Sequence, residues 1–142
     1  MTAEFGHHYI AGQWLSDAPN GFSEVENPSN GSIIGTAPNG SAGLAENAVM
    51  AAREAFESTD WASNPRQRAA ALLEFADILE SRADEIAALM ARENGKVLAQ
   101  ARHEVAAGYG EARYYAGVAR NVFGRTFESG AGKLSLMTRE PS

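Results

Sequence analysis

The spacing of apolar residues changes twice along the chain: short runs come first, helical spacing follows, and alternation with polar residues appears near the C-terminus. Between residues 9 and 37, short apolar runs such as Tyr9-Ile10 and Trp14-Leu15 are separated by turn-forming residues. Two longer runs, at 22–25 and 33–36, flank the segment Asn27-Pro28-Ser29-Asn30-Gly31. Short runs bounded by Asn, Gly and Pro are typical of β-hairpins. We therefore predict hairpins over residues 9–37 and a disordered N-terminus over residues 1–8.

Helical spacing begins at Ser41. Leucine, alanine and phenylalanine then recur three and four residues apart up to Phe56. This period places the apolar side chains on one face of an α-helix. Ser41 is a residue type that accepts a hydrogen bond from the free N–H groups of a first helical turn. The pattern predicts a helix over residues 41–58.

A second helical stretch is predicted over residues 65–94. Asn64 suits the N-cap, and Pro65 suits the first helical position, where its missing N–H costs nothing. Gly95 can adopt the left-handed conformation that ends a helix. Within the stretch, Ser81 to Asp84 has the form of an internal capping pair. The stretch is therefore either one long helix or two helices separated by a break near residue 81.

The third helical stretch spans residues 98–122 and carries small residues on one side. Val105, Gly108, Ala112 and Ala116 share that side, which indicates either close packing against a neighbouring helix or the wall of a substrate passage. Beyond it, apolar and polar residues alternate over 134–138, which predicts a strand for which the sequence shows no partner.

Composition narrows the class of protein. The chain has 142 residues, of which 44% are hydrophobic, enough for one ordinary core. Its net charge of -6 argues against a nucleic-acid or anionic-membrane surface, which needs clustered Lys and Arg. Neither a signal-peptide pattern nor a run approaching about 18 apolar residues is present. We therefore expect a cytoplasmic protein that does not cross a membrane.

Local motifs for chemistry are weak. The sequence contains no cysteine, which excludes disulfides, thiolate metal sites and a thiol nucleophile. The segments 94–96 and 130–133 lack the first glycine of a phosphate-binding loop. The histidines, His7, His8 and His103, do not form a metal-ligand pattern. Carboxylate pairs occur at helical spacing and indicate solvent-facing helix surfaces: Asp77 with Glu80, Glu80 with Asp84, and Glu104 with Glu111.

Several strings, in order, resemble the N-terminal part of the aldehyde dehydrogenase superfamily. Tyr9 to Trp14 is similar to "YINGxW", and Asn27 to Gly31 is similar to "NPxTG". Further along, four segments resemble "AVxAAxxAF", "LLxxxADxLE", "xxGKP" and "RYYAG": residues 48–56, 72–80, 93–96 and 113–117. Arg139-Glu140-Pro141 matches the "REP" before the family's first cofactor-contacting strand. Val97 and Asn30 depart from the family's proline and threonine.

The resemblance implies a fold and a division of the chain. The chain would be α+β, with N-terminal hairpins, three to four long helices and a C-terminal oligomerisation strand, as part of the α/β aldehyde dehydrogenase fold. Residues 9–124 would be the N-terminal part of the cofactor-binding domain. Residues 125–142 would begin the oligomerisation arm of a homodimer or homotetramer.

The resemblance also implies an activity that this chain cannot perform alone. In the family, a cysteine attacks the aldehyde, an asparagine helps to stabilise the oxyanion, hydride passes to NAD or NADP, and a glutamate activates water. These side chains lie beyond the "REP" strand, so we expect no catalytic and no cofactor-binding residue here. The remainder of an aldehyde dehydrogenase subunit would be the partner.

The same resemblance implies two further sites. The backbone carbonyls of Val25, Glu26 and Glu93 would bind a Na or K ion, although a plain turn explains these positions equally well. His103 and Ala107 would border the substrate entrance. The competing hypothesis is a stand-alone helical module that binds a protein and has no enzymatic activity.

Overall fold

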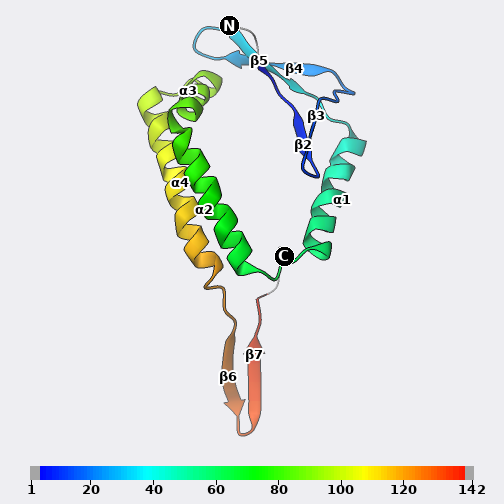
Figure 1. Cartoon of the computed structure of the whole chain (residues 1–142), viewed down its shortest axis with the longest axis vertical. Helices are drawn as coiled ribbons and strands as arrows, with labels where there is room; N and C mark the ends of the chain where they lie inside the picture. The colour runs from blue at the N-terminus through cyan, green and yellow to red at the C-terminus, as the bar shows by residue number, and fades with distance from the viewer. Residues whose placement is uncertain (1–3, 140–142) are drawn as a thin grey trace.

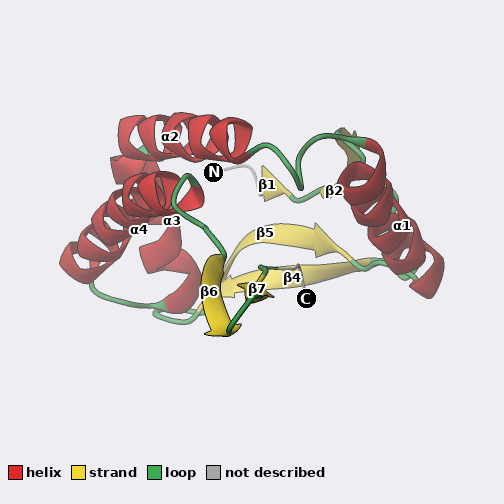
Figure 2. Cartoon of the chain, turned by 90° about the horizontal axis from the view of Figure 1, so that it is seen from below, coloured by secondary structure: helices red, strands yellow, loops and turns green. Residues whose placement is uncertain are grey.

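The computed structural model describes residues 4–139 and has three small sheets and four helices (Figure 1). Helices α2 (Pro65–Ser81), α3 (Ala83–Asn94) and α4 (Leu98–Ala119) pack together on one side. Helix α1 (Ala42–Ser58) lies on the opposite side, and the strands between these two sides complete an open arch (Figures 1 and 2). The predicted mixture of hairpins and three to four long helices is confirmed.

The N-terminal strands form two of the sheets. Strands β2 (His8–Ile10) and β3 (Gln13–Leu15) form one antiparallel hairpin, and β4 (Phe22–Asn27) pairs antiparallel with β5 (Ser32–Pro38). The prediction of disorder over residues 1–8 is wrong for the described part. Strand β1 (Glu4–Phe5) pairs in parallel with β5 because the free edge of β5 offers hydrogen-bond partners to its backbone. Residues 1–3 lie outside the described residues.

The helices begin and end at the predicted capping residues. The hydroxyl of Ser41 accepts a hydrogen bond from Leu44 N at 3.2 Å, and Asn64 Oδ1 accepts one from Gln67 N at 3.1 Å. Gly95 adopts φ +72° directly after α3. The second stretch is two helices, separated at Arg82. The Ser81 hydroxyl donates back to Ile78 O at 2.8 Å, so it does not form the capping pair with Asp84.

The C-terminal region differs from the prediction in two ways. Helix α4 ends at Ala119, three residues before the predicted end, and the Asn121 side chain donates to Gly117 O at 2.8 Å. Strand β7 (Lys133–Met137) has a partner in the chain, β6 (Arg125–Gly130), and the two form an antiparallel hairpin that extends away from the helices (Figure 1). Periodicity missed β6 because Phe127 is its only large apolar residue, so apolar and polar residues do not alternate along it. Glu140 and Pro141 lie outside the described residues.

The core lies between the helices and consists of small side chains. Among the described residues, every buried hydrophobic side chain is an alanine except Val105. Ala69, Ala76, Ala112 and Ala116 are the buried residues of α2 and the C-terminal half of α4, which pack against each other. The small residues of α4 therefore serve close helix packing, the first of the two predicted explanations. No helix in the described part is long and apolar enough to span a bilayer.

Candidate functional site

The predicted cation site lies where strand β4 approaches the end of helix α3. These two elements are in contact, and Gly95 lies so near the turn after β4 that a Cβ on it would be 2.9 Å from Pro28 Cγ. The structure therefore brings the segment that contains Val25 and Glu26 close to the segment that contains Glu93.

The backbone at this junction is irregular on both sides. The register of the β4–β5 ladder shifts between Val25 and Glu26, because β5 has one extra residue, Ile34, opposite this pair. Glu93 lies in the last turn of α3, where carbonyls have no partner further along the helix. Carbonyl oxygens are suitable ligands for hard cations, so the donor types fit a Na or K ion. The ion itself stays a prediction.

His103 and Ala107 lie one turn apart on the exposed face of α4. Ala101 and Val105 occupy the opposite, buried face. The structure therefore brings His103 and Ala107 together on a surface that the other helices leave open. Their place at a substrate entrance stays a prediction.

Three of the carboxylates noted in the sequence, Asp77, Glu80 and Asp84, take part in ion pairs that connect the helices. Arg113 Nη2 on α4 lies 2.8 Å from Asp77 Oδ1 and 2.5 Å from Glu80 Oε2, both on α2. The hydrogen bonds to Glu80 and Asp77 raise the pKa of the Arg113 guanidinium above its ordinary value. Arg102 pairs with Asp84 in the same way across α4 and α3. These carboxylates stay solvent-exposed, as predicted, but they also fix helix positions.

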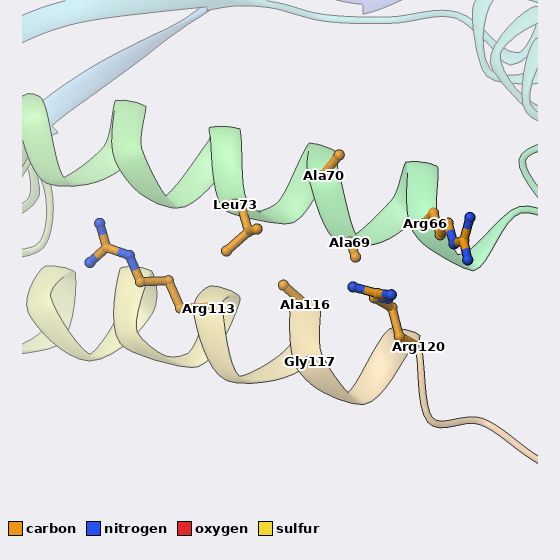
Figure 3. A pocket seen from close by; sticks show the side chains of 8 residues that line it. All are labelled: Arg66, Ala69, Ala70, Leu73, Arg113, Ala116, Gly117 and Arg120. Carbon is orange, nitrogen blue, oxygen red and sulfur yellow. The ribbon is translucent and has the colours of Figure 1, made fainter.

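A groove between α2 and α4 was not found from the sequence. It has a volume of about 490 Å³, an apolar floor and three arginines on its rim (Figure 3). The arginines are Arg66 on α2 and Arg113 and Arg120 on α4. No motif could have found it, because only the packing of two helices far apart in sequence brings these side chains together.

Known proteins share this arrangement of elements. The model of the aldehyde dehydrogenase family matches residues 14–142, most of the chain. This chain belongs to the aldehyde dehydrogenase family. The resemblance inferred from the sequence strings is thus confirmed.

Individual family members match over almost the whole chain. Malonate-semialdehyde dehydrogenase of Bacillus pumilus is 35% identical over 136 residues, which cover 94% of this chain and 28% of that protein. The structure of an NAD-dependent aldehyde dehydrogenase from Sinorhizobium meliloti has a TM-score of 0.87 at 30% identity and covers 94% of this chain and 27% of its own. A putative aldehyde dehydrogenase from Burkholderia cenocepacia has a TM-score of 0.88 at 36% identity, with coverages of 96% and 29%.

These matches show how much of an aldehyde dehydrogenase this chain represents. The chain spans less than a third of the length of each of these relatives, and it corresponds to their N-terminal part. The hairpins and helices described here are therefore the N-terminal portion of an aldehyde dehydrogenase fold.

Proposed function

We propose that this chain supplies the N-terminal part of an NAD(P)-dependent aldehyde dehydrogenase subunit, which converts an aldehyde, NAD(P) and water into a carboxylic acid. One observation carries the proposal: the family match extends over residues 14–142, in a fold that superimposes on less than a third of its relatives. The catalytic cysteine expected for the family has no counterpart among these residues, because the sequence contains no cysteine.

The chain by itself is therefore inactive in this proposal. Oxidation by a family member requires a thiolate that adds to the aldehyde carbonyl, and NAD(P) then accepts the hydride. The residues present here support the reaction indirectly, by packing against the cofactor domain of the same subunit.

The surface of α1 fits a segment that another part of the protein covers. Helix α1 has no buried residue, yet Val49 is 67% exposed and Met50 is 61% exposed. Exposed apolar side chains on one helix are typical of a surface that another part of a protein covers. A stand-alone module that binds a protein would expose such a surface as well, so the family match over residues 14–142 is what favours the enzyme segment.

The test combines mass and activity. The intact mass of the source polypeptide is measured first, and the same material is then assayed with a panel of aldehydes and NAD or NADP. We expect NAD(P) reduction only from a polypeptide that is longer than 142 residues, or that is associated with a chain containing a cysteine. Aldehyde oxidation by the pure 142-residue chain would refute the proposal.

The finer family features belong to this proposal too. They are a Na or K ion on the carbonyls of Val25, Glu26 and Glu93, a substrate entrance beside His103 and Ala107, and assembly into a homodimer or homotetramer through residues 125–142. The exposed hairpin β6–β7 supports the last of these, since Leu134 and Leu136 are 69% and 68% exposed. The cytoplasmic location stays a prediction from the sequence.

A further inference from the structure

The groove between α2 and α4 has the size and lining of a small-molecule site. Its volume of about 490 Å³ falls within the range of ligand pockets, which is roughly 300–1,000 Å³. The floor consists of small or apolar residues from both helices: Ala69, Ala70, Leu73, Ala116 and Gly117. Figure 3 shows Arg66 and Arg120 toward one end of this floor and Arg113 toward the other.

The arginines at the two ends differ in their partners. Arg113 is neutralised by Asp77 and Glu80. Within residues 4–139, by contrast, neither the guanidinium of Arg66 nor that of Arg120 makes an ion pair or a hydrogen bond. Two guanidinium groups therefore lie toward the same end of the groove without a counter-charge in the described part (Figure 3).

Arg66 is also unusual for its position in helix α2. It lies in the first turn, which contains no acidic residue. The helix dipole disfavours a cation there, so the end of the groove is positive for a second reason. An anion placed between Arg66 and Arg120 would reduce this repulsion, and the planar guanidinium forks match a carboxylate.

We propose that the α2–α4 groove binds a carboxylate that has a short aliphatic body. Arg66 and Arg120 hold the carboxylate, and the aliphatic part lies on Ala69, Leu73 and Ala116. A small inorganic anion would use the charges and leave the apolar floor exposed, whereas a neutral aliphatic molecule would leave the guanidinium groups unpaired. The proposal rests on this lining and does not depend on the proposed dehydrogenase activity.

Binding is tested on the whole purified polypeptide that carries these residues, by calorimetry and ligand-observed NMR. The probes are hexanoate, acetate, inorganic phosphate and hexanol. We expect hexanoate to bind about tenfold or more tightly than acetate. Hexanoate has four methylene groups that acetate lacks, and burial of about two of them already corresponds to this factor. Phosphate and hexanol are expected to bind more weakly than hexanoate.

Three variants assign the binding to the groove. R66A/R120A is expected to weaken hexanoate binding about tenfold or more, since a hydrogen bond to a charged group is worth roughly that factor. Ala70→Glu introduces a carboxylate one turn after Arg66 at an exposed position, and we expect it to compete with the probe. The matched control, R53A/R102A, removes two positive charges outside the groove and should bind hexanoate unchanged.

The outcomes separate the parts of the proposal. Unchanged hexanoate affinity in R66A/R120A overturns it, and so does equal weakening in R53A/R102A. Acetate or phosphate binding as tightly as hexanoate overturns the role of the apolar floor, and hexanol binding as tightly overturns the role of the charges. Unfolding midpoints are measured for every variant, so that loss of fold is distinguished from loss of binding. Because the readout is binding, an inactive polypeptide gives the same test.

Discussion

Gly95 is the residue on which the turn after α3 depends. Its φ is +72°, and a Cβ at this position would be 2.9 Å from Pro28 Cγ in the turn after β4. Left-handed backbone costs a residue with a side chain about 1–2 kcal/mol. We therefore expect Gly95→Ala to lower the free energy of unfolding by at least about 1–2 kcal/mol, measured by urea denaturation.

A glycine within α4 provides the control for that measurement. Gly110 has helical backbone and no atom within 4 Å of a Cβ built on it. Gly110→Ala is expected to stabilise the protein by about 0.5–1 kcal/mol, because glycine loses more backbone entropy in a helix than alanine does. If both substitutions changed stability in the same direction, backbone conformation would not explain the effect at Gly95.

The pair of Arg82 and Glu85 spans the start of α3 and allows a prediction on pH. Arg82 Nε and Nη2 donate to the two Glu85 carboxylate oxygens at 2.9 and 2.7 Å. These hydrogen bonds, and then the positive charge, lower the pKa of Glu85. A lowered pKa stabilises the fold at pH values above the ordinary glutamate range, and this contribution is lost as the pH falls through the lowered pKa. An NMR titration of the Glu85 side chain should show the lowered pKa, and Arg82→Gln should restore the ordinary value. An equal pKa in both proteins would contradict the pairing.

Among the elements, the α2–α4 packing allows the clearest test. Ala112 is 8% exposed on the face of α4 that carries the buried residues, and α4 packs against α2, so a larger side chain at this position would have to displace its neighbours. Overpacking typically costs about 1–3 kcal/mol. We therefore expect Ala112→Leu to lower the free energy of unfolding by about this amount, measured by urea denaturation. Ala99→Leu, on the exposed side of the same helix, is the control and should change stability by less than about 0.5 kcal/mol.

Helices were predictable from the sequence because their signals are local. Ser41, Asn64 and Gly95 each act on the backbone within a few residues, so residue type and position were enough to place those helix ends. The pairing of β1 with β5, and of β6 with β7, depends on an open strand edge and was not visible in periodicity. Sequence order likewise could not show Arg66 and Arg120 beside one groove, since helix packing brings them together.

At the scale of the whole molecule, apolar side chains are unevenly distributed. The buried core contains alanines and one valine among the described residues, whereas many large apolar side chains on α1, α2 and the β6–β7 hairpin are exposed. A core of small side chains buries little apolar area. Most of the hydrophobic stabilisation of these segments therefore depends on contacts with surfaces outside the helices.

The hairpin β6–β7 provides the last test, since it extends away from the helices and has no covering element in the described part (Figure 1). If it joins subunits, L134K/L136K should shift the polypeptide to a smaller assembly in sedimentation velocity, because burial of two charged groups at an apolar interface is unfavourable. The unfolding free energy of the separated subunit should change little, since both leucines are exposed within the chain. A88K/A99K adds the same charge at exposed helical positions and should leave assembly intact. Equal dissociation of the two variants would assign the effect to net charge and would contradict a role for the hairpin in assembly.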